Sequence, residues 1–272
     1  MPHSPTLNRS ARCYVLSVWS LLYLMNGGHV RVVHRGPTGL LVTCLLVLGA
    51  LGLTAGLAAP GRVVGVLCAA VVSVATAVAT TRHRTSVLGP ADRVTLARCA
   101  LACGVAALTA DSLFGSGSQR VLVGMAAVAL ALDWVDGQVA RRTGTASAFG
   151  AALDMEVDAF LLVVLSVDVA YSFGSWVLLI GAARYALLVT AWLVPWLRRP
   201  VPTRYWAKVV AAVQGVVLVA AAADVLPVGV VCAALTVALA LLAESFGHQV
   251  WWLAQHRAAA ERRSSRPYEV AR

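Results

Sequence analysis

Two apolar stretches of this chain carry acidic residues at helical spacing: VLVGMAAVALALDWVDGQVAR at 121–141 and AFGAALDMEVDAFLLVVLSVDVA at 148–170. Each is long enough to cross a bilayer as a helix, which takes about 20 residues. Because the link between them is short, we expect the two helices to be antiparallel neighbours. Ionisable groups at membrane depth are costly, so they indicate a functional site rather than a surface.

The composition of the whole chain is that of an integral membrane protein. Of its 272 residues, 60% are hydrophobic and only 12% are charged, whereas about a quarter are charged in a typical soluble domain. The apolar residues fall in long runs, which predict spanning helices and exclude a soluble globular protein. The predicted helices lie at 38–59, 63–80, 94–110, 121–141, 148–170, 175–197, 205–223 and 226–254.

The arginines predict the orientation of these helices. The polar and basic segment 81–93 is interpreted as a cytoplasmic boundary, and most loop arginines then lie on its side of the membrane. The opposite side receives only Arg62 and Arg120. This bias predicts a multi-pass protein of the cell (plasma or inner) membrane with both termini in the cytoplasm. The net charge of +10 therefore indicates contact with anionic lipid, and not with nucleic acid.

The same pattern divides the chain into four parts. We expect a basic interfacial segment at 1–37, a transmembrane hairpin at 38–80, a six-helix catalytic domain at 81–255 and a basic cytoplasmic tail at 256–272. The six cysteines lie mostly inside apolar runs and form no CxxC pair. They are therefore expected to be buried free thiols.

The acidic residues of the two opening stretches are spaced so that they converge. At 100° per residue, one face of each helix carries a set of carboxylates and small residues. The first face comprises Asp133, Asp136, Gly137, Ala140 and Arg141, and the second comprises Gly150, Asp154 and Asp158. Four carboxylates are thus predicted to meet between the two helices, on the cytoplasmic side.

Four carboxylates in a low dielectric repel one another, so a positive charge must neutralise them. An all-carboxylate set favours hard cations such as Mg²⁺ or Mn²⁺, and two such ions are suited to displacement at phosphorus. A purely structural ion-pair network is the alternative. Only Arg141 and Arg142 are near in sequence, and they cannot balance four carboxylates. Arg141 is instead placed to hold a phosphate oxygen. The glycines on the same faces have no side chain, so a phosphate group can approach the helix backbone there.

The residues from Asp133 to Asp158 match, at every fixed position, the pattern DxxDGxxAR(x8)GxxxDxxxD. This pattern resembles the signature of the CDP-alcohol phosphatidyltransferases. The resemblance implies an all-α integral membrane fold, with a six-helix core over roughly 88–255 to which the N-terminal transmembrane hairpin is an addition. It also implies an enzyme of phospholipid biosynthesis that transfers a phosphatidyl group from CDP-diacylglycerol to a small alcohol and releases CMP.

The resemblance implies roles for individual residues. Two divalent cations, Mg²⁺ or Mn²⁺, would be held by four aspartates, of which Asp158 would also be the catalytic general base. The metal ligands are Asp133, Asp136, Asp154 and Asp158. The CDP pocket would be lined by Gly137, Ala140, Arg141 and Gly150, and by Asp92 and Thr95 of the segment DRVTLAR, which resembles the family's NxxTxxR opening. A homodimer is implied as well.

Three basic residues are candidates for binding a phosphorylated acceptor alcohol: Arg184, Arg204 and Lys208. Arg184 lies inside an apolar helix, where it either pairs with an acidic neighbour or binds the acceptor phosphate. The basic residues favour a phosphorylated acceptor, with glycerol 3-phosphate as the first candidate. Residues 207–214 resemble a stretch of phosphatidylglycerophosphate synthases, but Val210 and Ala211 replace its second lysine and its threonine. Inositol phosphate and a lipid acceptor, as in cardiolipin synthesis, remain open.

A cation transporter that uses the carboxylates as an ion path is the alternative from another class of function. It predicts acidic residues distributed through the bilayer rather than gathered on two consecutive helices. Two acidic residues are expected to lie outside the metal site. Glu156 lies about 200° around the helix from Asp154, and Asp168 is interpreted as polar packing.

Overall fold

The structure is a computed structural model that describes residues 35–83, 90–143, 148–194 and 205–264. Within these ranges every regular element is helical, as the apolar runs predict. The helices are α2 (Arg35–Thr54), α3 (Ala59–His83), α4 (Pro90–Leu113), α5 (Gln119–Thr143), α6 (Ala148–Phe173), the short 3₁₀ helix η3 (Ser175–Val177), α7 (Leu178–Leu193), α8 (Tyr205–Ala222) and α9 (Val228–Ser264). Most of the segment 1–37 and the end of the tail predicted at 256–272 lie outside the described residues.

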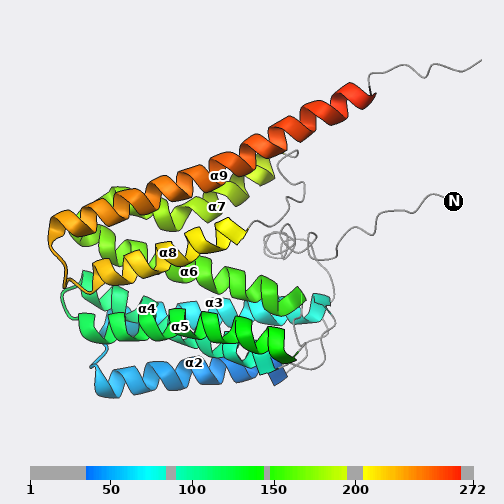
Figure 1. Ribbon diagram of the computed structural model, residues 1–272. Coiled ribbons are helices and arrows are strands. Elements are labelled where there is room, and N and C mark those ends of the chain that lie inside the picture. Colours follow the sequence, from blue (N-terminus) through cyan, green and yellow to red (C-terminus); the bar gives the residue numbers. More distant parts are fainter. Residues whose placement is uncertain (1–34, 84–89, 144–147, 195–204, 265–272) are drawn as a thin grey trace, which may run out of the picture.

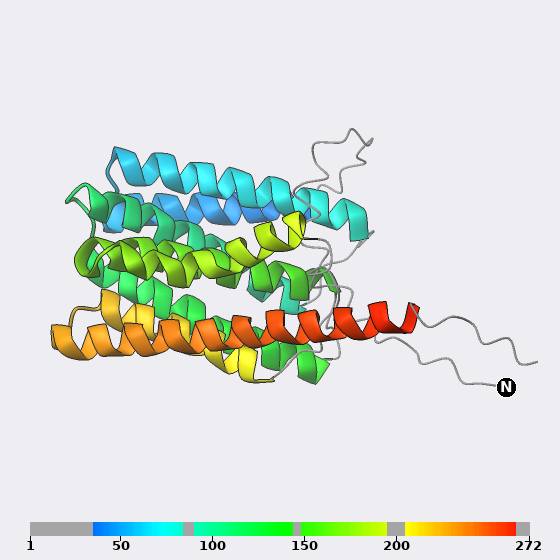
Figure 2. The same cartoon turned by 90° about the horizontal axis from the view of Figure 1, so that it is seen from above.

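The helices run up and down in one bundle, which is an all-α integral membrane architecture (Figure 1). Helix α4 lies inside this bundle, where it packs against α2, α3, α5 and α6. The hairpin α2–α3 and the long helix α9 lie on opposite sides, and the C-terminal end of α9 projects beyond the other helices (Figures 1 and 2).

Four described helices are long and apolar enough to cross a membrane: those spanning Ala59–Ala77, Val94–Leu113, Ser175–Leu193 and Val228–Gln255. The apolar parts of α2 and α8 are shorter. Helix α6 is long, but every 18-residue window of it holds at least three acidic residues. The acidic residues that mark the predicted site therefore also weaken the membrane signal of the helix that carries them.

Several helix ends differ from the sequence prediction, among them the end of α2, which lies at Thr54 rather than at 59. Two of the differences have a clear local cause. The helix predicted to reach residue 197 ends at Leu193, and Val194 is extended with φ −119° and ψ 93°. Val194 precedes Pro195, and a residue before proline is disfavoured in the helical region. The last helix, predicted to end at 254, continues to Ser264 through alanine, glutamate and arginine, which are good helix formers.

Small side chains allow α4 to approach its four neighbours closely. Residues 99–110 of α4 are all buried or half-buried, and alanine, cysteine and glycine dominate this segment. Small residues at helix interfaces permit close backbone packing in membranes. The five described cysteines (Cys44, Cys68, Cys99, Cys103 and Cys232) are free thiols, as predicted.

A buried carboxylate fastens the hairpin to α4. Asp111 is 1% exposed and accepts hydrogen bonds from the backbone N–H groups of Ala58 (2.8 Å) and Gly61 (2.7 Å). These groups belong to the start of α3, where helix N–H donors have no partner within the helix. A Cβ at Gly61 would lie 2.6 Å from the Ala107 carbonyl oxygen and from Asp111, so only glycine allows this approach.

Asp168 forms a second polar contact, near the same end of α4. It is 7% exposed and accepts hydrogen bonds from Ser112 Oγ and Gln119 Nε2, both at 2.8 Å. Gln119 Nε2 also donates to the Ala222 carbonyl oxygen at 3.0 Å. The prediction that Asp168 is polar packing is therefore confirmed, and the contact connects α4, α5, α6 and α8.

We expect Gly61→Ala to destabilise the protein by about 1–3 kcal/mol, because the added methyl group overpacks the contact between α3 and α4. Gly49→Ala is the matched control, because no atom beyond its own stretch of helix lies within 4 Å of a Cβ placed there. That change should be neutral or stabilising by up to about 1 kcal/mol, since alanine favours helices. Thermal unfolding in detergent measures both, and equal unfolding temperatures would contradict the docking described above.

Candidate functional site

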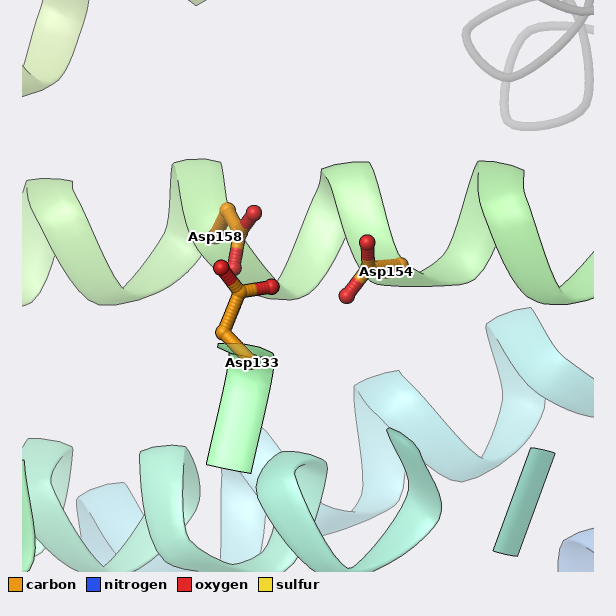
Figure 3. Close-up of side chains that lie close together, drawn as sticks. All are labelled: Asp133, Asp154 and Asp158. Carbon is orange, nitrogen blue, oxygen red and sulfur yellow. The ribbon is translucent and has the colours of Figure 1, made fainter. Parts of the chain in front are cut away.

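Three aspartates from two helices gather at one place in the bundle. Asp133 projects from α5 towards α6, on which Asp154 and Asp158 lie one turn apart (Figure 3). One carboxylate oxygen from each residue lies within 4.8 Å of the others. We refer to these three residues as the aspartate cluster. Its side chains are 34–41% exposed, so three of the four carboxylates predicted to converge lie together and are open to solvent.

Several of the predicted site residues have side chains outside the described part of the structure. Four of them belong to the last turns of α5, one to the first turn of α4, and one precedes α8. They are Asp136, Gly137, Ala140, Arg141, Asp92 and Arg204. Their assignments stay predictions. Gly150 lies in α6, one turn before Asp154, and Thr95 lies in α4 and is buried.

The structure adds to the site a cationic residue that has no role among the predictions from sequence. Arg98 of α4 is completely buried. Its Nη1 lies 3.0 Å from Asp133 Oδ1, and the same guanidinium pairs with Asp154 and Asp158. Its Nε donates a hydrogen bond of 3.2 Å to the Ala129 carbonyl oxygen on α5. One side chain thus contacts every member of the aspartate cluster.

Two sequence signals for Arg98 exist, and the first is that it fills the last position of DRVTLAR, the segment that resembles NxxTxxR. It also lies within an apolar helix, VTLARCALACGVAAL, at 94–108, and the cost of an intramembrane cation, which drew attention to Arg184, applies to it equally. Only Arg141 and Arg142 lie near the aspartates in sequence. Arg98 lies 56 and 60 positions before Asp154 and Asp158, so charges close in sequence do not reveal it.

Arg98 does not neutralise the aspartate cluster. Three carboxylates face one guanidinium, so these four residues carry an excess of two negative charges when all three aspartates are ionised. An arrangement that served only as an ion pair would be closer to balance. The donor set consists of carboxylate oxygens, which Mg²⁺ and Mn²⁺ prefer. The three oxygens lie within 4.8 Å of one another, so a small closure brings them within the about 4.2 Å that two opposite ligands on one Mg²⁺ span. The residues therefore fit a divalent cation.

Arg184, the tentative acceptor ligand, pairs with Glu156. Arg184 Nη2 lies 2.8 Å from Glu156 Oε1, and both side chains are about a quarter exposed. Pairing with an acidic neighbour was one of the two interpretations offered by the sequence. Arg184 Nε is buried and has no hydrogen-bond partner among the described residues. Glu156 is not a member of the aspartate cluster, which agrees with its expected exclusion from the metal site.

Lys208 and Gln214 of α8 differ in their exposure to solvent. Lys208 is exposed. Gln214, which ends the stretch that resembles phosphatidylglycerophosphate synthases, is completely buried and donates a hydrogen bond of 2.8 Å to the Ala238 carbonyl oxygen of α9. Gln214 therefore contributes to the packing of α8 on α9, while Lys208 is free to approach a polar molecule.

Comparison with known proteins assigns the family. A family model described as CDP-alcohol phosphatidyltransferase matches residues 88–244, which is more than half of the chain and includes α4 to α8, the whole aspartate cluster and Arg98. No curated protein and no solved structure matches the chain. The matched residues leave out the α2–α3 hairpin. The chain therefore belongs to the CDP-alcohol phosphatidyltransferase family.

Proposed function

We propose that this protein transfers a phosphatidyl group from CDP-diacylglycerol to a small phosphorylated alcohol and releases CMP, with glycerol 3-phosphate as the first candidate acceptor. The family carries the reaction class, because its members act on CDP-alcohols and belong to phospholipid biosynthesis. The observation that supports an active site in this chain is the aspartate cluster, whose three half-exposed carboxylates retain an excess of negative charge.

In the proposed reaction, Asp158 takes the proton from the acceptor hydroxyl group as that oxygen attacks the phosphorus attached to diacylglycerol. The new O–P bond forms as the bond between this phosphorus and the oxygen of CMP breaks, and CMP leaves. Divalent cations held by Asp133, Asp136, Asp154 and Asp158 would supply charge stabilisation to the attacking and leaving oxygens. The exposure of Asp158, at 37%, supports its access to an acceptor.

The CDP pocket is proposed to lie beside the aspartates. Gly137, Ala140, Arg141 and Gly150 belong to α5 and α6, and Asp92 and Thr95 belong to α4. These are the three helices that bring Arg98 and the aspartate cluster together. Thr95 lies one turn before Arg98 and is buried, which supports a place for its hydroxyl group near the carboxylates.

The acceptor site is proposed to use Arg184, Arg204 and Lys208. The exposure of Lys208 supports a role in binding an anion. The Arg184 side chain is a quarter exposed, and its buried Nε has no hydrogen-bond partner among the described residues, which supports a donor role towards a phosphate oxygen while Nη2 stays with Glu156. Inositol phosphate is the next candidate, and a lipid acceptor is a further one. The loop arginines support a membrane orientation in which the site faces the cytoplasm, and the proposed homodimer follows from the family resemblance.

Replacement of the aspartates tests the reaction. Asp158→Asn and Asp133→Ala should each lower the rate of CMP release from CDP-diacylglycerol by about 10²-fold or more, since the first removes a general base and the second a cation ligand. Purified protein in detergent with Mg²⁺ or Mn²⁺ gives this rate. Asp224→Asn, an equal loss of charge at an exposed loop residue, should retain the wild-type rate. Full activity of either cluster variant would refute the mechanism.

The acceptor is identified by measuring CMP release with a panel of alcohols. We expect glycerol 3-phosphate to support turnover, and glycerol, which lacks the phosphate, to fail. Arg184→Gln should then raise the KM for the acceptor while the KM for CDP-diacylglycerol stays unchanged, because only the acceptor's phosphate loses a donor.

Glu156→Gln is the control for the acceptor prediction, because it breaks the same ion pair and keeps the arginine. If the pair is only structural, the two variants will lower the unfolding temperature alike and leave the acceptor KM unchanged. If only a phosphatidyl lipid or only a neutral alcohol supports turnover, the proposed phosphorylated acceptor is wrong.

A further inference from the structure

Arg98 is held in place by contacts that need no bound ion. Its side chain is completely buried, and its Nε donates to the Ala129 carbonyl oxygen at 3.2 Å. The two ends of the guanidinium point to different members of the aspartate cluster, with Nη1 on Asp133 and Asp154 and Nη2 on Asp158. A planar group with donors in fixed directions can connect several carboxylates in this way, which an ammonium group cannot.

This position brings the guanidinium close to any cation that the same carboxylates hold. Arg98 contacts the Oδ1 atom of all three residues, so a divalent cation on the cluster would lie only a few ångströms from a fixed positive charge. At such separations in a partly buried site, the repulsion between like charges is substantial. Without Arg98, however, the three carboxylates would face one another at close range and lose the cation that contacts all of them.

We propose that Arg98 is the built-in counter-ion of the aspartate cluster: it holds the three carboxylates together while no divalent cation is bound, and it weakens their affinity for that cation. The inference rests on the metal site of the proposed function and adds to it a residue that sets how tightly the site binds. Arg98 thus acts through the aspartates as a positioning residue.

A purely structural role makes the opposite prediction for metal binding. If Arg98 only fastened α4 to α5 and α6, its removal would misplace the carboxylates, and the affinity for a divalent cation would fall or stay constant. If it is a counter-ion, its removal deepens the negative charge of the cluster, and the affinity rises although the metal-free protein becomes less stable. Affinity and stability therefore change in opposite directions only in the second case.

The test measures Mn²⁺ binding to the purified full-length protein in detergent, by electron paramagnetic resonance of free Mn²⁺, without any substrate. Arg98→Met removes the charge and keeps much of the side-chain volume. We expect it to lower the Kd for Mn²⁺ about tenfold or more and to lower the unfolding temperature in EDTA. Arg120→Met is the matched control, because this exposed arginine begins α5, about 20 Å along the helix from Asp133. It should change neither quantity.

Two further variants keep the proposal testable if Arg98→Met folds poorly. Arg98→Lys retains the positive charge and should bind Mn²⁺ within about threefold of the wild type. The double variant Arg98→Met with Asp154→Asn removes one charge of each sign, and in EDTA it should unfold at a higher temperature than Arg98→Met alone.

An unchanged or weakened Mn²⁺ affinity in folded Arg98→Met, or a double variant no more stable than the single one, would overturn the counter-ion role and leave the metal site standing. Absence of Mn²⁺ binding by the wild type itself would remove the metal site and this inference together.

Discussion

The interior of this bundle is governed by the cost of leaving a charge unpaired in a low dielectric. Each described acidic residue within it meets that cost with a different partner. Asp111 uses the N–H groups at the start of α3, Asp168 uses a hydroxyl and an amide group, and Glu156 uses Arg184. In each of these contacts the carboxylate has donors matched to it. Among the described residues, the aspartate cluster differs from these contacts because three carboxylates gather on one cation, Arg98.

This difference separates the structural carboxylates from the functional ones better than burial does. Asp111 and Asp168 are almost fully buried and are satisfied by neutral donors, which is how a carboxylate serves packing. The aspartate cluster is half-exposed, so a polar molecule can reach it, and it retains charge that a divalent cation can neutralise. The cost of assembling three carboxylates is reduced by Arg98, which leaves the site assembled but not balanced.

Helices and the aspartate cluster were predictable because both depend on local sequence. The length of an apolar run predicts a spanning helix. Helical periodicity places Asp154 and Asp158 on one face of α6. The short link between α5 and α6 then brings Asp133 to the side that faces them. The early end of α7 is explained by Pro195, but the apolar run continues past this proline to residue 197, so apolar length alone predicted a longer helix. Arg98 was not predicted as a member of the site, because its contacts are to residues 56 and 60 positions away, and no local periodicity encodes which face of α4 turns towards α6.

The hairpin α2–α3 lies outside the residues that define the family, yet its packing reaches the site through α4. By covering α4, the hairpin converts a helix that would otherwise face lipid on one side into a buried one, and Asp111 fixes the position of α3 along it. Arg98 lies 13 residues before Asp111 on that helix, which is about 20 Å along its axis. A rigid helix transmits its position over such a length, because its hydrogen bonds lie within the helix itself. The hairpin therefore contributes to the fixed position of Arg98, and through Arg98 to the arrangement of the aspartate cluster, without contributing a side chain to it among the described residues.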